Sequence, residues 1–473
     1  MNRLLIIISM LLLTLSMVAK QRVVILTDVE NEPDDTESLV RLMLYTNDID
    51  VRGIVAATST HMRDRIAPET IHKIIDAYEK VRPNLLLHSA DYPEAAYLRS
   101  LVKKGTMKYG MKGVGKGCDS EGSNWIIQEL ERDDDRPLWV CAWGGVNVLA
   151  QALFQLKASK TEAQLKALVD KLRVYTISDQ DDTGIWIRRT FPSLFYIVSP
   201  GGYGNGTWTG IMQTAEGADN ACISNQWLNE HIQSGHGPLG ACYPDVAYGM
   251  EGDTPSWLNL IPNGLNAPEH PNWGGWGGRY RFYQPRRDDC DPGGFTGGVP
   301  VEDEPRAIWT NDVDCYTPFL PHSHGCAVVK DTMAYCGFTT TVWRWRTAFQ
   351  NDFAARMDWC TRSYEEANHA PVPALTHDDE LLVRGGDTVV LDATPSSDPD
   401  GDGLSFLWFC YPEAGDGTAV QIDGAPNIHR VKVRVPKVTL PTEIHVILQV
   451  TDKGTPALTR YKRVILHVMR ARS

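Results

Sequence analysis

Short apolar segments alternate with helix-like segments over the first two hundred residues, and this alternation constrains the fold more than any other feature. Apolar, β-branched runs predict buried strands at residues 22–26, 51–57, 84–88, 138–142, 174–177 and 194–198. Apolar residues at helical spacing predict helices at residues 36–46, 66–81, 123–131, 147–157 and 165–172. This order is typical of an α/β fold with a mainly parallel sheet and flanking helices, in which ligands bind at the carboxyl ends of the strands.

The pattern changes twice further along the chain. Residues 201–337 are rich in Gly, Pro, Trp and Asn and show little periodicity, and residues 339–366 have a helical pattern. Short strands are then predicted at residues 388–391, 405–409, 431–435, 443–450 and 460–468, which is typical of an all-β sandwich. We therefore expect an α/β domain at residues 20–366, a linker at 367–374 and a β-sandwich domain at 375–473.

The amino terminus has the features of a secretory signal at residues 1–19. Arg3 precedes an apolar run over residues 4–18, which is shorter than the ~20 residues of a membrane span. We expect cleavage, no remaining membrane span, and a secreted or periplasmic protein; a single membrane anchor is the alternative. The ten cysteines suit an oxidising compartment, with disulfides expected within the cluster of cysteines from Cys290 to Cys336, their pairing left open, and a buried free thiol at Cys141. The net charge of −13 argues against a nucleic-acid partner.

Five acidic residues lie within eight positions, directly after the first predicted strand and before the first predicted helix. They are Asp28, Glu30, Glu32, Asp34 and Asp35. Repulsion makes such a group costly without a counter-charge, and a hard divalent cation such as Ca²⁺ supplies one through oxygen ligands. A helix amino terminus also favours carboxylates, so capping is the alternative explanation for Asp34 or Asp35. The whole group together predicts a metal site.

Several segments resemble the nucleoside hydrolases, which are calcium-dependent enzymes that cleave N-ribosidic bonds. The acidic loop resembles their amino-terminal signature, VRGIVAATST (51–60) is similar to the strand that follows it, and WGGVN (143–147) is similar to their Gly-Pro-Leu-Thr-Asn turn. The segments RVYTISDQDDTGIWIRRTFPSLFYIVSP (173–200) and EGDTPSWLNLIPNGLNAPEHPNWGGWGGRY (251–280) resemble secreted bacterial proteins of the cellulose-binding type, which have a nucleoside-hydrolase-like domain. This resemblance covers nearly the whole mature chain. The carboxy-terminal segment resembles PKD-type immunoglobulin-like modules, with an acidic turn at residues 392–402 before a strand that contains Trp408.

The resemblance to nucleoside hydrolases implies roles for individual residues. The last two aspartates of the loop correspond to a general base that activates water, Asp34, and to a Ca²⁺ ligand, Asp35. The further metal ligands that it implies are Asp28, Glu30, the backbone carbonyl of Val146, and Asp253, which we favour over Asp245.

The chain departs from nucleoside hydrolases in the expected substrate pocket. Glu32 replaces a glycine, Thr60 stands where that family keeps an asparagine and is followed by His61, and SDQDDTGIW (178–186) fills the place of the ribose-binding residues. The expected substrate-binding residues are Glu32, Thr60, His61, Asn147, Asp179, Gln180, Asp181, Trp186, His270, Trp273 and Trp276. We expect Asp179, Asp181, Trp186, Trp273 and Trp276 to line one cleft with Asp34. The alternatives are buried indoles in a tight loop for Trp273 and Trp276, and a surface position for His270 rather than a proton donor.

Three functions remain open from the sequence. The first is a metal-dependent hydrolase of N- or O-glycosyl bonds that acts on a glycan or glycoside, with Asp34 as general base. The second is a non-catalytic carbohydrate-binding protein, cellulose-binding in type, on a nucleoside hydrolase scaffold. The third is a true nucleoside hydrolase. The sequence leaves the sugar, the linkage and the oligomeric state open.

Overall fold

The computed structural model describes residues 19–200, 207–290, 299, 301–321, 328–330 and 334–471. Residues 1–18 of the predicted signal lie outside the described residues, so its cleavage and the secreted location stay predictions. Within the described ranges, no helix combines the length and the apolar character that crossing a bilayer requires.

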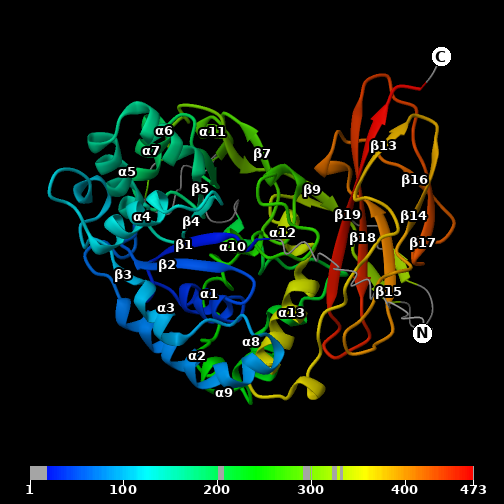
Figure 1. Ribbon diagram of the computed structural model, residues 1–473, viewed down its shortest axis with the longest axis horizontal. Helices are drawn as coiled ribbons and strands as arrows, with labels where there is room; N and C mark the ends of the chain where they lie inside the picture. Colours follow the sequence, from blue (N-terminus) through cyan, green and yellow to red (C-terminus); the bar gives the residue numbers. More distant parts are fainter. Residues whose placement is uncertain are drawn as a thin grey trace, which may run out of the picture.

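An eight-stranded sheet forms the centre of the α/β part (Figure 1). Its strand order is β3-β2-β1-β4-β5-β6-β8-β7, and every neighbouring pair is parallel except β7 with β8. The strands are β1 (Arg22–Thr27), β2 (Asp50–Ala56), β3 (Val102–Lys104), β4 (Leu138–Ala142), β5 (Leu172–Thr176), β6 (Phe195–Val198), β7 (Tyr280–Tyr283) and β8 (Ile308–Asn311). The expected mainly parallel α/β fold is confirmed.

Helices cover both faces of this sheet. Alternate strand residues point to opposite faces, and apolar residues on each face pack against the helices. Val23 and Ile25 join one apolar core, and Val24 and Leu26 join the other. The main helices are α1 (Pro33–Met43), α2 (Pro68–His88), α3 (Ala95–Leu101), α4 (Glu121–Glu131), α5 (Asn147–Ser159), α6 (Glu162–Lys171), α7 (Thr183–Thr190) and α13 (Arg346–Asp358). Helices α1, α2 and α13 pack into the first core, and α4, α5 and α7 into the second.

One strand prediction is wrong. Residues 84–88 belong to α2, whose buried stripe runs from Ile71 through Tyr78 and continues to Leu85. The run that resembles a strand is therefore the last turns of a long amphipathic helix, and an internal proline, Pro83, does not end it. The sheet edge is taken instead by β3, which the sequence did not predict.

The described residues between 207 and 345 form mainly short elements. The helical turns are η3 (Thr207–Thr209), η4 (Ala221–Ile223), α8 (Asn225–Leu228), η5 (Asn229–Gln233), α9 (Gly237–Gly240), α10 (Pro255–Leu258), η6 (Pro271–Trp273), α11 (Arg287–Cys290) and α12 (Thr340–Trp343), with η1 (Gly110–Gly113) earlier and η7 (Tyr364–Glu366) later. Two small hairpin sheets pair β9 (Asp314–Tyr316) with β12 (Tyr335–Gly337), and β10 (Phe319–Pro321) with β11 (Val328–Lys330). A disulfide joins Cys315 to Cys336, and Cys141 is a buried free thiol, as the sequence predicted.

The carboxy-terminal part is an all-β sandwich, as predicted. One sheet has the order β13-β19-β18-β15 and the other β14-β17-β16. The strands are β13 (Glu380–Arg384), β14 (Thr388–Asp392), β15 (Ser405–Cys410), β16 (Gln421–Asp423), β17 (Arg430–Arg434), β18 (Thr442–Thr451) and β19 (Thr459–Met469), with a turn η8 (Pro412–Ala414). Trp408 is buried in the core between the two sheets. The sequence missed β13 and β16, and the exact bounds of the linker and of the two domains stay predictions.

Buried polar contacts join the sandwich to the α/β part. Tyr411 donates its hydroxyl to Oδ2 of Asp314 at 2.6 Å, and Arg460 lies 2.7 Å from a carboxylate oxygen of Asp352. Trp345 packs its ring against Tyr411 and Tyr461, each at 5.8 Å between centroids. Because Tyr411 and Arg460 each bond a buried carboxylate of the α/β part, the sandwich is held against that part rather than tethered loosely to it.

Candidate metal centre

The acidic loop follows β1 and leads directly into α1. Pro33 takes the first helical position, where its missing N–H costs nothing, and Asp34 and Asp35 follow in the first turn. Both carboxyl groups point back over the carboxyl end of the sheet and are 5% and 3% exposed. The helix amino terminus favours their negative charge, but it does not compensate several buried carboxylates at one point.

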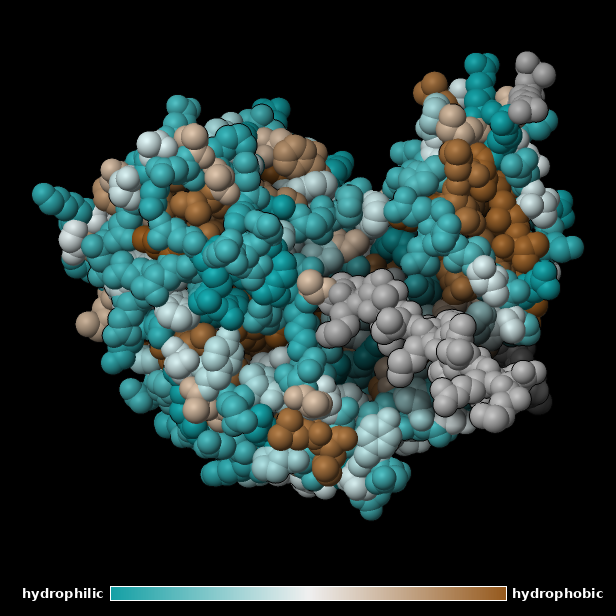
Figure 2. All heavy atoms as spheres, viewed as in Figure 1, coloured by the Kyte–Doolittle hydropathy of each residue, from teal (hydrophilic) through white to brown (hydrophobic). Residues whose placement is uncertain are grey.

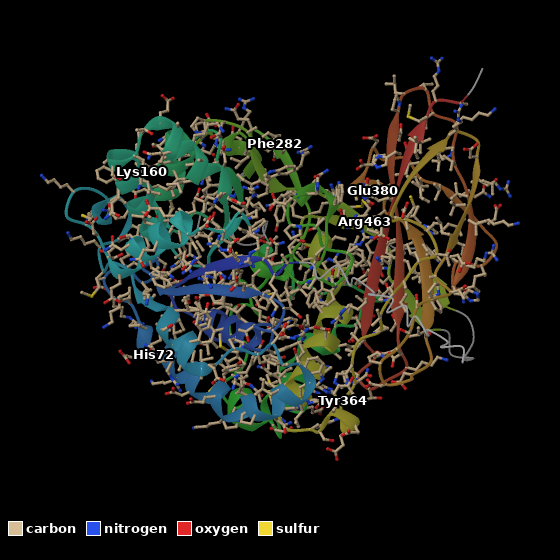
Figure 3. All side chains as sticks on the ribbon, in the orientation of Figure 1. His72, Lys160, Phe282, Tyr364, Glu380 and Arg463 are labelled. Atoms are coloured by element: carbon tan, nitrogen blue, oxygen red, sulfur yellow. A yellow bond between two sulfur atoms is a disulfide. The ribbon has the colours of Figure 1, made fainter. Side chains whose placement is uncertain are left out.

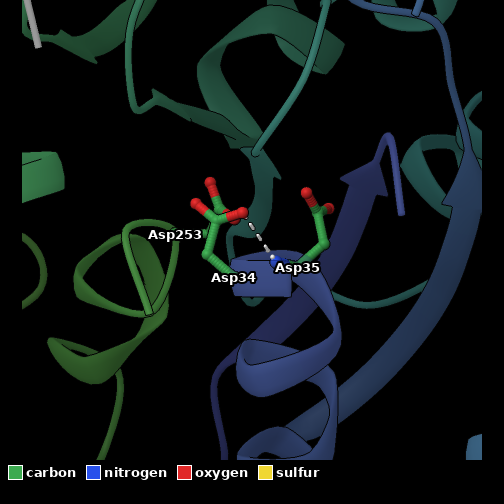
Figure 4. Close-up of side chains that lie close together, drawn as sticks. All are labelled: Asp34, Asp35 and Asp253. Carbon is green, nitrogen blue, oxygen red and sulfur yellow. Dashed lines mark hydrogen bonds between the residues drawn. The ribbon is translucent and has the colours of Figure 1, made fainter. Parts of the chain in front are cut away.

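Three aspartates converge on one point at this edge of the sheet (Figure 4). One carboxylate oxygen from each of Asp34, Asp35 and Asp253 lies within 4.8 Å of the other two. Asp28 lies beside them, where interactions with Asp35 and Ser59 lower its pKa against the larger rise from burial. We call these four aspartates the acidic centre. Ca²⁺ bonds oxygen at ~2.3–2.6 Å, which places opposed ligand oxygens roughly 5 Å apart, so the spacing fits such an ion.

The electrostatics of the acidic centre show a deficit of positive charge. Burial raises the pKa of Asp28, Asp35 and Asp253, and the neighbouring carboxylates raise the last two further. Burial likewise raises the pKa of Asp34 to about 7. Oδ2 of Asp28 and Oδ2 of Asp253 are buried with no hydrogen-bond partner. A divalent cation between these oxygens supplies the missing partner, so the residues present fit a metal.

Asp34 differs from the other members because the protein holds both of its oxygens. Its Oδ2 accepts a 2.9 Å hydrogen bond from the indole Nε1 of Trp208, and its Oδ1 accepts one of 3.1 Å from the backbone N–H of Asp35. Asp35 accepts a hydrogen bond from Oγ1 of Thr27 through Oδ1. Asp34 is therefore oriented by the protein, whereas Asp253 presents an oxygen that has no partner.

Trp208 is a site residue that the sequence did not reveal. It lies on η3, and its indole fits against the loop that carries Asp253. A Cβ at Gly252 would lie 2.1 Å from the indole, and one at Gly249 would lie 2.9 Å from it. No spacing in the sequence singles out this tryptophan among the fourteen, because its role depends on a loop 40 residues later approaching its ring.

Buried contacts from α1 hold the loop that carries Asp253. Oε2 of Glu37 accepts the backbone N–H of Glu251 at 2.7 Å, where Glu251 has a left-handed φ of 47°. The Glu251 side chain contacts Nε of Arg41 at 2.8 Å and accepts a 2.7 Å hydrogen bond from Tyr243. One helix thus presents two members of the acidic centre and positions the loop of a third.

The structure corrects the expectation for Glu30. Its φ of 79° turns the side chain outward, where a carboxylate oxygen lies 2.8 Å from Nη1 of Arg65 and the other accepts a hydrogen bond from Thr70. Glu30 is 42% exposed, so it lies outside the acidic centre. The strict spacing that suggested a ligand was misleading because the loop reverses direction at this residue.

The loops after β2, β4 and β5 meet beside the acidic centre. Gly144 lies so close to Asp28 that a Cβ there would be 2.6 Å from Oδ1. Asn147 donates from its backbone to Asp181 at 3.2 Å and from Nδ2 to Oγ1 of Thr58 at 3.1 Å. The Val146 carbonyl accepts the backbone N–H of Ala150, so it begins α5, and its role toward a metal stays a prediction.

Several expected substrate residues are occupied in holding these loops. Asp181 is 1% exposed and accepts two hydrogen bonds from Thr183. Nε2 of Gln180 donates to the Trp143 carbonyl at 2.7 Å, which leaves Oε1 of Gln180 buried without a partner. Asp181 and Gln180 thus hold the loops that form the wall of the site. Their direct contact with a substrate stays a prediction.

The rim of the acidic centre includes Glu32 and His61. Burial raises the pKa of Glu32, while the charge of His61 lowers it. His61 has an exposed side chain and also lowers the pKa of Asp28 by its charge. Thr60 accepts hydrogen bonds from Arg63 and is nearly buried. Glu32 and His61 therefore remain the expected residues best placed to meet a ligand.

Two expected residues point to other partners. Asp179 pairs with the buried Arg188 at 2.6 Å. Trp186 lies on α7, packed against the second core, with its ring edge-on to Phe191 at 6.1 Å. Both have structural contacts that explain their positions, and no described contact joins either to the acidic centre.

The expected cleft does not include the two tryptophans of residues 273–278. Trp276 is fully buried and packs against Phe349, so it has no face for a sugar. Trp273 stacks on His270 at 4.0 Å and meets His445 of the sandwich at 5.0 Å. The segment that carries these two tryptophans therefore lies at the junction of the two parts and not at the carboxyl edge of the sheet.

Comparisons with known proteins agree with this architecture. Residues 22–280 match the family model described as cellulose-binding Sde182, nucleoside hydrolase-like domain, and residues 388–468 match that of the cellulose-binding protein Sde0182, C-terminal domain. A solved nucleoside hydrolase-related hypothetical protein from Saccharophagus degradans, described as associated with carbohydrate metabolism, is 34% identical with a TM-score of 0.78. The alignment covers 95% of this chain and 100% of that one.

Two further solved structures are only weakly similar. The effector protein XOO4466 is 10% identical with a TM-score of 0.34, covering 62% of this chain and 88% of that one. The type III effector XopQ is 10% identical with a TM-score of 0.29, covering 52% of this chain and 69% of that one. No curated protein matches the sequence. The extent of the family match and of the Saccharophagus alignment shows that this chain belongs to the cellulose-binding Sde182 family, with a nucleoside hydrolase-like domain followed by the family's C-terminal domain.

Proposed function

We propose that the chain is a secreted metal-dependent hydrolase of glycosidic bonds, N- or O-glycosyl, that acts in glycan degradation. The observation that carries this proposal is the division of roles within the acidic centre. Asp34 has both oxygens held by the protein, while Asp28 and Asp253 each present a buried oxygen without a partner. A carboxylate that the protein orients beside the ligand oxygens is placed to accept a proton from a water molecule.

Asp35 and Asp253, from the converging set, and Asp28 beside them would hold the ion, and Ca²⁺ is the ion that suits irregular oxygen ligation. When bound, a divalent cation lowers the pKa of a nearby water and attracts sugar hydroxyls. Asp34 then accepts the proton from the attacking water, since its carboxylate is oriented beside the ligands. Glu32 and His61 at the rim provide polar groups for the sugar.

Two alternatives have their own support. The family is described as cellulose-binding, which favours a non-catalytic carbohydrate-binding protein. The Saccharophagus relative is described as nucleoside hydrolase-related, which favours a true nucleoside hydrolase. A hydrolase of glycosyl bonds explains the oriented Asp34 better than the first. It also explains, better than the second, why Glu32 and Thr60 stand in place of the glycine and the asparagine that the resemblance to nucleoside hydrolases implies.

The experiment is a turnover screen of the mature protein on oligosaccharides, aryl glycosides and nucleosides, with added Ca²⁺ or with chelator. The proposal expects hydrolysis of a glycoside that chelator abolishes and Ca²⁺ restores. Hydrolysis confined to nucleosides would establish the third function. Glycan binding without turnover, unchanged by Asp34→Asn, would establish the binding protein instead.

A further inference from the structure

The junction between the two parts contains a group of packed residues that lies apart from the acidic centre, and we call this group the floor. His270 is exposed and stacks on Trp273 with ring centroids 4.0 Å apart and planes 9° from parallel. Gly274, which follows Trp273, has a φ of 71°, and its carbonyl accepts a 2.9 Å hydrogen bond from Arg463. A Cβ at Gly274 would lie 2.4 Å from the Tyr411 hydroxyl, so only glycine allows this approach. Figure 3 shows Arg463 where the two parts meet.

A row of aromatic rings rises from this junction on the α/β side. Phe282 of β7 and Trp309 of β8 are register partners, with ring centroids 5.2 Å apart and planes tilted by 51°. Phe195 of β6 continues the row at 6.2 Å. Phe282 is 55% exposed, although a large aromatic side chain at a sheet edge is costly to leave in water. Phe195 is the first residue of β6, so the row starts at the end of the sheet opposite to the acidic centre.

The sandwich side carries polar groups instead. Glu443 of β18 and His467 of β19 are register partners, and Nε2 of His467 lies 3.0 Å from a carboxylate oxygen of Glu380 on β13. Glu443 in turn contacts the buried His445 at 2.9 Å. Figure 3 shows Glu380 across from Phe282, and Figure 2 shows a hollow between the two parts above their junction.

We propose that this hollow is a binding groove for a neutral polysaccharide chain, separate from the acidic centre. The tilted faces of Phe282 and Trp309 stack on successive sugar rings, and Glu443 and His467 bond sugar hydroxyls from the opposite wall. This proposal depends on the proposed function only in the class of ligand, which is a carbohydrate. It gives the chain a place to retain a polymer whether or not the acidic centre cleaves it.

Charge selects a neutral polymer over an anionic one. Glu380 and Glu443 supply carboxylates on the sandwich that are 66% and 37% exposed, and the chain carries a net charge of −13, so uronate chains are repelled. Burial and the neighbouring Arg463 lower the pKa of His445 to about 4, so the imidazole beneath Glu443 is neutral at neutral pH and Arg463 is the cation beside it. Carboxylate oxygens accept hydrogen bonds from sugar hydroxyls without a charged partner.

The test measures binding of neutral hexaoses of β-1,4-linked glucose, xylose and mannose, and of hexagalacturonate, by calorimetry. The variants are Phe282→Ala, which removes a 55% exposed ring, and His467→Ala on the opposite wall. Tyr97→Ala is the matched control, because it removes a 38% exposed aromatic ring on α3. We expect at least one neutral hexaose to bind, Phe282→Ala to weaken it about tenfold or more, and Tyr97→Ala to leave it unchanged.

The same measurement separates this groove from the acidic centre. Asp35→Ala should bind the neutral hexaose as the wild type does, even where it abolishes turnover. The proposal is overturned if no neutral hexaose binds, if hexagalacturonate binds in preference, if Phe282→Ala binds with wild-type affinity, or if Asp35→Ala alone abolishes binding.

Discussion

The indole N–H of Trp208 donates a 2.9 Å hydrogen bond to Oδ2 of Asp34, across 174 positions of the sequence. This contact fixes the one carboxylate of the acidic centre that lies in the first turn of α1 and is held by the protein at both oxygens. The hydrogen bond from Trp208 distinguishes Asp34, the proposed base, from the proposed metal ligands, which the residue spacing of the acidic loop does not.

Trp208→Phe removes this hydrogen bond and keeps an aromatic ring in place. A hydrogen bond to a charged group contributes about 1.5–3 kcal/mol, so turnover of the best substrate should fall about tenfold or more. The Ca²⁺ affinity, measured by calorimetry, should stay within about threefold because no proposed ligand is touched. Trp227→Phe, which changes a half-buried indole tilted by 38° against the His231 ring, is the control. Loss of Ca²⁺ binding in Trp208→Phe would contradict this division of roles.

Asp34→Asn tests the base itself. The amide is nearly isosteric but cannot accept the proton of the attacking water, so turnover should fall roughly 10²-fold or more while the fold and metal binding persist. Steady-state kinetics and the thermal transition of the same preparation give both readouts. Full activity of this variant on the best substrate would show that another group is the base.

Gly252→Ala should destabilise the loop that carries Asp253. Its new Cβ would lie 2.1 Å from the Trp208 indole, so the ring or the loop has to move, at a cost of about 1–3 kcal/mol. Denaturant unfolding measures this loss. Gly337→Ala, where the nearest atom to the new Cβ is 3.9 Å away, is the matched control and should unfold like the wild type. Equal stability of the two variants would mean that Trp208 is not packed as described.

Stability at low pH should depend on Asp352 at the junction. Arg460 and Arg356 lower its pKa from 3.8 to about 2, against the opposing effect of burial. A depressed folded-state pKa stabilises the native protein above the unfolded-state pKa, and this contribution disappears as the pH falls from about 4 to 2. The wild type should therefore lose about 2 kcal/mol in this window through this residue. Asp352→Asn should be less stable at pH 7 and show a shallower decline in urea unfolding; an equally steep decline would contradict this origin.

Local sequence patterns predicted the strands and helices that position the acidic centre, because each pattern there agrees with its tertiary environment. The β1–α1 unit and the buried strand before Gly144 are examples. The pattern failed at residues 84–88, where a buried helix and a buried strand share the same apolar residues. Only packing against neighbouring elements distinguishes the two.

The site was predictable only in part, for a different reason. Asp34, Asp35 and Asp253 were predicted and converge, but Glu30 turns outward at a left-handed residue that nothing in the sequence marks. Trp273 and Trp276 look like sugar-stacking residues, yet one packs at the junction and the other in the core. Trp208 was missed because its contact with Asp34 depends on how a long irregular segment folds back.

Calorimetric titration of the mature protein with Ca²⁺ tests the central claim most directly. The wild type should bind one ion with an affinity that Glu30→Gln, a matched loss of a nearby carboxylate outside the acidic centre, leaves unchanged. Asp253→Asn should weaken binding by at least about tenfold, because it removes the charge of a buried oxygen that has no other partner. A wild type that binds no Ca²⁺, or an Asp253→Asn variant that binds it as tightly as the wild type, would contradict the account.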